Sequence, residues 1–268
     1  CAKKLERPSR ICTLRCVPER LSAMVANLMS AQRDEVSSIG FGKLNEMKCG
    51  RLNRKLCEWL VERVDMARSI LNVHGTELEL RLHSFGYIMG ISYGGLNVEL
   101  DGNMEEVSGY LKLYKSNSNG IHIKKLADIL RHQNVADDQF KVTFTLFALC
   151  SVLCPAGGVH ISSSFLFALK DVERIRSRNW VSFCFGRFMQ GITKYREEKL
   201  SYIGGCLLYL QILYINSLLY VKIKRDPTLC PVVLWDAKEI RRFMKWLNKQ
   251  GGIGTDKVWF MVKTLIVK

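Results

Sequence analysis

The chain has 268 residues, of which 48% are hydrophobic and 24% are charged, so its composition excludes an intrinsically disordered protein. This length suits one large domain or two small ones. The 40 Lys and Arg residues exceed the 25 Asp and Glu residues, which gives a formal net charge of +15. Such an excess favours an acidic partner, nucleic acid above all, although a basic protein without such a partner shows the same excess.

The first half of the chain predicts short helices and one β-hairpin. A helix is expected to begin near Pro18, and a second one is expected over 31–39. An apolar stripe at helical spacing predicts a further helix over 54–65. Residues 69–80 then change to the alternation of a β-hairpin, with its turn at 74–75.

Residues 96–120 carry few core signals and end in a polar run typical of a loop, which indicates a boundary or an exposed insertion between two subdomains. The expected organisation begins with a basic irregular segment at 1–17, followed by an N-terminal helical subdomain with the hairpin at 18–110. A helical core subdomain is expected at 121–249, and a C-terminal segment at 250–268.

The second half of the chain predicts longer helices, at 123–131, 139–153, 165–171, 180–195, 203–223 and 237–249. Asp236 and Glu239 have the spacing of a capping box at the start of the last of these helices. Short strands are expected at 230–235 and 258–267. The fold class is therefore mainly α, a multi-helix bundle-like domain with a small β-hairpin near residues 69–80.

The segment 203–223 is almost entirely apolar and is long enough to span a bilayer. Gln211, Asn216 and Lys222 interrupt it, and no clear second span accompanies it. A helix that is apolar all round can equally be the central helix of a large core. The core helix is the favoured interpretation, and a membrane-attached protein is the alternative.

The C-terminal helix is the sharpest candidate for binding. Its apolar face carries Ile240, Phe243, Met244 and Leu247. The opposite face and the segment before the helix carry cations that could follow a phosphate backbone, namely Lys222, Lys224, Arg225, Lys238, Arg241, Arg242, Lys245 and Lys249. A solvated face with no ligand is the alternative interpretation.

The ten cysteines lie far apart and mostly in apolar segments, which indicates reduced, buried thiols. Two pairs, Cys12 with Cys16 and Cys150 with Cys154, have a spacing that zinc sites use. His132 and His160 lie near the second pair, but Cys150 and Cys154 stand in an apolar helical segment, so buried thiols are favoured and no metal is expected. Cys206 opens a helix, where the helix dipole could stabilise a thiolate, but no His accompanies it. We therefore expect no catalytic residue and no cofactor, with a cysteine-dependent hydrolase as the alternative.

Three motifs, MGISYGG at 89–95, ISSSFLFALKDV at 161–172 and GGCLLYLQI at 204–212, carry a family resemblance. Further matching segments lie at 39–44, 52–65, 71–75, 147–155 and 179–180. The chain resembles a plant transposon-derived domain that precedes SUMO-protease-type (ubiquitin-like protease) cysteine peptidase regions, and more distantly the plant mobile domain that is often labelled aminotransferase-like.

This resemblance implies a non-enzymatic interaction module for protein or nucleic acid, located beside a peptidase or transposase region. The sequence has neither the His-Trp pair nor the Asp-Cys-Gly signature of that peptidase, so the matching part is the non-catalytic one. No lysine stands in a context that resembles a pyridoxal-phosphate site. Residues 1–20 lack the apolar stretch of a signal peptide, which favours a nuclear or cytoplasmic protein.

Overall fold

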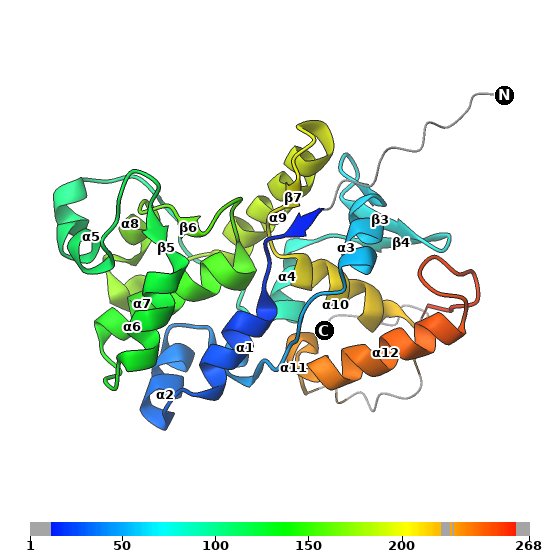
Figure 1. The fold of residues 1–268 in the computed structure, drawn as a ribbon, viewed down its shortest axis with the longest axis horizontal. Coiled ribbons are helices and arrows are strands. Elements are labelled where there is room, and N and C mark those ends of the chain that lie inside the picture. The colour runs from blue at the N-terminus through cyan, green and yellow to red at the C-terminus, as the bar shows by residue number, and fades with distance from the viewer. Residues whose placement is uncertain (1–11, 221–225, 227, 261–268) are drawn as a thin grey trace.

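The computed structural model describes residues 12–220, 226 and 228–260, and it confirms a mainly α fold with small sheets (Figure 1). In its first part, short helices precede a small sheet: β1 (Thr13–Leu14), α1 (Pro18–Ala26), α2 (Ser30–Ser38), the 3-10 helix η1 (Gly42–Glu46), α3 (Arg54–Val61), β2 (Val64–Asp65), β3 (Ile70–Val73), β4 (Thr76–Glu79) and α4 (Leu82–Met89). Pro18 takes the first position of α1, where its missing N–H costs no helical hydrogen bond.

The predicted β-hairpin is present, as the antiparallel pair β3–β4 with Val73 opposite Thr76. His74 and Gly75 form its turn, and both have the positive φ that a tight hairpin turn requires, 49° and 71°. The helix predicted over 54–65 ends earlier, at Val61, because Val64 and Asp65 pair with β3 and add a third strand to the sheet.

The middle of the chain is helical, with two short strands: η2 (Met104–Val107), α5 (Ser108–Tyr114), β5 (Ile121–His122), α6 (Ile123–His132), α7 (Asp138–Ala148), the π-helical turn η3 (Leu149–Leu153), β6 (His160–Ile161), α8 (Phe165–Leu169), η4 (Val172–Arg174) and α9 (Trp180–Glu197). Within 96–120, which the sequence marks as poor in core residues, η2 and α5 form, and the side chains of Val107 and Tyr114 are buried. The side chain of Asp137 caps α7 by accepting from the N–H of Phe140 at 2.8 Å.

The last part of the described chain contains β7 (Tyr202–Ile203), α10 (Leu207–Ser217), α11 (Pro231–Leu234) and α12 (Ala237–Lys249). The helix expected over 203–223 is therefore shorter, because Tyr202 and Ile203 pair in parallel with Thr13 and Leu14 of β1. In the described ranges, no helix has the length and apolar character needed to cross a membrane.

The strand predicted at 230–235 was wrong, since Pro231 starts the short helix α11 there. Of the strand predicted at 258–267, Phe260 forms an isolated bridge with Leu218, and the part after Phe260 lies outside the described residues.

The core is one continuous cluster of buried side chains that draws on residues before and after the polar run at 115–120. Helix α10 supplies its centre, because Leu208, Tyr209, Leu210 and Ile212 are fully buried and so cover more than one side of the helix. An apolar helix buried on all sides is what a large core requires. The two-subdomain organisation itself stays a prediction.

Candidate nucleic-acid interface

Helix α12 has the bounds that the sequence predicts, Ala237–Lys249. The carboxylate of Asp236 accepts from the N–H groups of Lys238 and Glu239 at 2.7 and 2.8 Å, which satisfies two of the free donors at the helix start. The predicted capping box is only half formed, because the Glu239 carboxylate pairs with Arg242 at 2.5 Å.

The apolar face of α12 is anchored to the body of the protein. Phe243 and Leu247 are fully buried, and the Phe243 ring lies edge-on to Trp235 and to Tyr220, with ring centroids 5.7 and 5.5 Å apart. The N–H of Ala237 also donates to the carbonyl of Lys48 at 3.0 Å. These contacts fix the rotation of the helix about its axis, and so they decide which side chains face the solvent.

The opposite face exposes all five predicted cations of the helix, Lys238, Arg241, Arg242, Lys245 and Lys249. Arg241 lies along its own helix, with Nε donating to the carbonyl of Ala237 at 3.0 Å. Arg242 pairs with Glu239, and exposed pairs of this kind contribute little net stability, so the guanidinium can exchange partners. The three predicted cations upstream, Lys222, Lys224 and Arg225, lie outside the described residues.

Of the four cysteines in the two pairs, three are buried and Cys150 is half-buried. Cys12 and Cys16 are buried, and the Cys16 thiol donates to the carbonyl of Val152 at 3.5 Å. Cys150 is half-buried and donates to the carbonyl of Phe147 at 3.4 Å. Throughout the part of the chain that the structure describes, no three His, Cys, Asp or Glu side chains gather in a way that could hold a metal ion.

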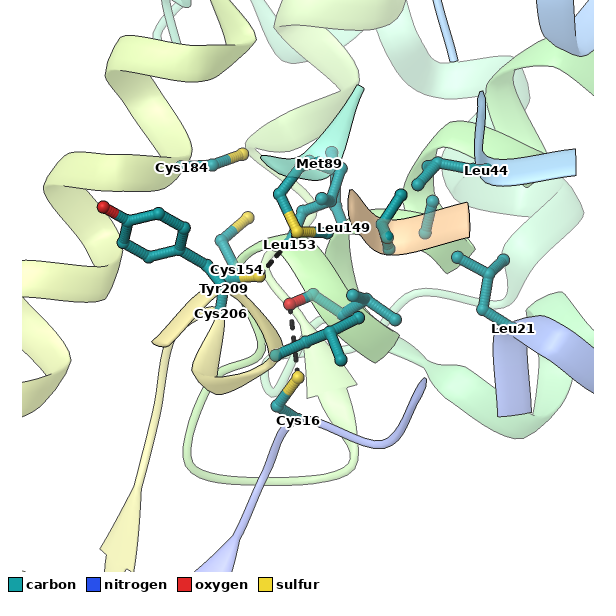
Figure 2. Packing of buried hydrophobic residues seen from close by; sticks show 14 of the residues in the cluster. Cys16, Leu21, Leu44, Met89, Leu149, Leu153, Cys154, Cys184, Cys206 and Tyr209 are labelled. Atoms are coloured by element: carbon teal, nitrogen blue, oxygen red, sulfur yellow. Dashed lines mark hydrogen bonds between the residues drawn. The ribbon is translucent and has the colours of Figure 1, made fainter. Parts of the chain in front are cut away.

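Cys206 is the N-cap of α10, as predicted, but its thiol is fully buried (Figure 2). Its Sγ lies 3.9 Å from Sδ of Met89. Burial, followed by the neighbouring Cys206, raises the pKa of the Cys16 thiol well above its usual value. Cys184 shows the same pattern, with burial first and Cys154 next as the causes of its raised pKa. The raised pKa values of Cys16 and Cys184 are typical of inert core thiols, whereas a nucleophilic cysteine needs a lowered one.

His74 has a structural role that its position in a turn does not reveal. Its Nε2 shares a hydrogen bond of 2.9 Å with the hydroxyl of Tyr214, and its ring packs against Trp59 at 5.4 Å. Partial burial lowers the pKa of the imidazole, and the charge of Asp256 opposes this shift. The ring is therefore held neutral against the core.

This burial predicts a pH dependence of stability. With a lower pKa in the folded state, the unfolded chain binds the proton more readily, so the free energy of unfolding falls as the pH drops below about 6.5. His74→Asn, which tolerates the positive φ, is expected to flatten this fall in urea denaturation at pH 7 and pH 5. The exposed His83 on α4 provides the control, and an unchanged slope in His74→Asn would contradict the assignment.

The fold and the exposed cationic face together define a mainly α-helical domain with a basic C-terminal helix. Residues 14–211 match a protein family described as a domain of unknown function, DUF8566. Since the match covers well over half of the chain, the chain belongs to this family. No curated protein and no solved structure matches the chain. The matched segment ends within α10, so α12 lies beyond it.

Proposed function

We propose that this chain is an interaction module that binds the phosphate backbone of nucleic acid through the exposed face of α12. The observation that supports this is the display of five cations on a helix whose opposite face is fixed in the core. From Lys238 to Lys249 the face extends about 16 Å, which matches several successive phosphates of one strand.

The free energy of counterion release favours binding of phosphate groups at this face. Each phosphate neutralised by Lys or Arg releases condensed counterions, and this release drives sequence-independent binding. The docked helix directs all five side chains to one side, and Arg242 exchanges the Glu239 carboxylate for a phosphate on binding. The net charge of +15 adds long-range attraction for a polyanion.

The proposal extends to the context that the sequence resemblance implies. In that context, the domain is a non-enzymatic part of a plant transposon-derived protein and acts in the nucleus or cytoplasm beside a peptidase or transposase region. The proposal assigns no catalytic group, no metal and no cofactor to it. A protein partner at the same face is the alternative outcome of the test below.

Binding of duplex DNA and of RNA, measured by fluorescence anisotropy across salt concentrations, tests the proposal. We expect the logarithm of affinity to fall linearly with the logarithm of salt concentration, and Arg241→Gln/Arg242→Gln/Lys245→Gln to reduce the slope by about 2–3. The matched control, Lys55→Gln/Lys112→Gln/Arg176→Gln, removes the same charge from exposed positions on other parts of the surface. An equal loss in both variants, or no binding at low salt, would refute the proposal.

A further inference from the structure

A cleft of about 290 Å³ lies between helix α9 and the loop that connects η3 to β6. From α9, the cleft is lined by Arg187, Gln190, Gly191 and Lys194. The last three follow Arg187 by three, four and seven residues, which places all four on one face of the helix. His160 and Tyr202 line it from the strands β6 and β7. The loop before β6 therefore meets α9 and the β7 segment that follows it around one small space.

Glycines let the main chains of these segments approach closely. A Cβ atom on Gly157 would lie 2.3 Å from the hydroxyl of Tyr202, and one on Gly191 would lie 2.6 Å from the carbonyl oxygen of Gly204. Gly205 has a φ of +79°, and its N–H donates to the carbonyl of Pro155 at 3.0 Å. The base of the cleft is thus built largely from main chain.

The polar groups of the cleft favour an anion. Arg187 and Lys194 line it, and among the residues that the structure describes no carboxylate does. By contrast, the larger cleft of about 720 Å³ beside α1 and α6 includes the carboxylate of Glu19 among its lining groups. The Arg187 guanidinium is held in place by Gln190, with Nη1 3.4 Å from Oε1, and by the Phe183 ring, 5.3 Å from its centroid.

Main-chain donors add to this set. Within the described residues, no carbonyl accepts from the N–H groups of Gly157 and Gly158, so these donors remain for a ligand or water. An arginine fork, an ammonium group and main-chain N–H groups are the donors that proteins combine around phosphate oxygens. Two full positive charges also match the charge of a phosphate monoester.

We propose that this cleft binds the phosphate monoester group of a small molecule, of the size of a sugar phosphate or a mononucleotide. Arg187 and Lys194 hold the phosphate, and Tyr202 and His160 contact the organic part. The volume lies near the lower limit of about 300 Å³ for small-molecule sites, which excludes a large cofactor. The site lies within residues 14–211, the part that matches the family, and it is independent of the basic face of α12.

Isothermal titration calorimetry of the whole chain with AMP, glucose 6-phosphate and inorganic phosphate tests this site, with adenosine and glucose as unphosphorylated controls. We expect at least one phosphorylated probe to bind and both controls to fail. Arg187→Gln and Lys194→Gln should each weaken binding by at least about 10-fold, because each removes a charge-assisted hydrogen bond. Lys55→Gln on α3 and the triple variant of α12 should bind like the unmodified chain.

A second kind of variant tests the site if the charge substitutions disturb folding. Gly158 lines the cleft with room for a side chain, since the nearest heavy atom to a Cβ there is the His160 nitrogen at 3.9 Å. Gly158→Leu should therefore fold normally by circular dichroism and lose binding. The half-buried Cys150 also lines the cleft, and a bound ligand should slow its alkylation. Equal affinity in all variants, equal binding of the unphosphorylated controls, or no binding of any probe would overturn the proposal.

Discussion

Replacing Trp235 with alanine is expected to lower the free energy of unfolding by about 3–5 kcal/mol, the range for removing a fully buried aromatic side chain. The substitution leaves a cavity beneath α12, because the Trp235 ring contacts Phe243 of that helix and stacks on Tyr220 at 6.2 Å. It also removes the hydrogen bond from the indole N–H to Oδ1 of Asn216, 2.9 Å long. Urea denaturation followed by circular dichroism measures the loss.

Trp259→Ala is the matched control, because Trp259 is 75% exposed. Substitutions at such surface positions usually change stability by no more than about 0.5 kcal/mol. Since Trp235 supports the docking of α12, we also expect Trp235→Ala to weaken nucleic-acid binding, while Trp259→Ala leaves the positions of the α12 cations unchanged. Equal stability losses in the two variants would show that α12 does not pack as described.

Thiol labelling at pH 7 is expected to divide the described cysteines into two groups. The half-buried Cys150 and Cys230 should react first, although burial raises the pKa of both. The buried thiols need local or global opening and should react at least about 1000-fold more slowly than they do in urea. These are Cys12, Cys16, Cys49, Cys57, Cys154, Cys184 and Cys206. Mass spectrometry of iodoacetamide-treated protein identifies the sites, with Cys1→Ser used to remove the N-terminal thiol.

The alkylation rate of Cys206 distinguishes a core thiol from a catalytic one. Selective, fast alkylation of Cys206 in the folded chain would contradict its burial and would favour the cysteine-dependent hydrolase. Slow alkylation of Cys206 would assign this thiol to the core, where it contacts Met89. In that case the labelling pattern at the other cysteines should be unchanged in Cys206→Ser.

Features governed by local physics could be predicted from the sequence. The bounds of α12 follow from the Asp236 cap and from an apolar stripe that stays in phase over the whole helix. The hairpin follows from alternation and from a turn that suits positive φ. The basic face of α12 could be predicted for the same reason, because a helical period assigns each side chain to a face before any tertiary contact is known.

Features governed by tertiary pairing could not be predicted. The strands β1, β2, β5, β6 and β7 have two residues each, and two residues show no periodicity. The end of α10 was missed because its apolar composition continues after Ser217, where Leu218 turns to extended backbone. The anion-binding cleft was missed because the aromatic residues of α9 mark it as a core helix, and the loop that completes the cleft is far from it in sequence.

The parallel pairing of β1 with β7 also constrains the order of events during synthesis. Thr13 leaves the ribosome long before its partner Tyr202, because 188 residues lie between them in the chain. Contacts between such distant residues slow folding, because loop closure must precede them. The nascent chain must therefore hold the first strand unpaired, with the neighbouring buried cysteines Cys12 and Cys16 uncovered, until most of the domain has been translated. The topology thus leaves the N-terminal part of the core exposed until late in synthesis.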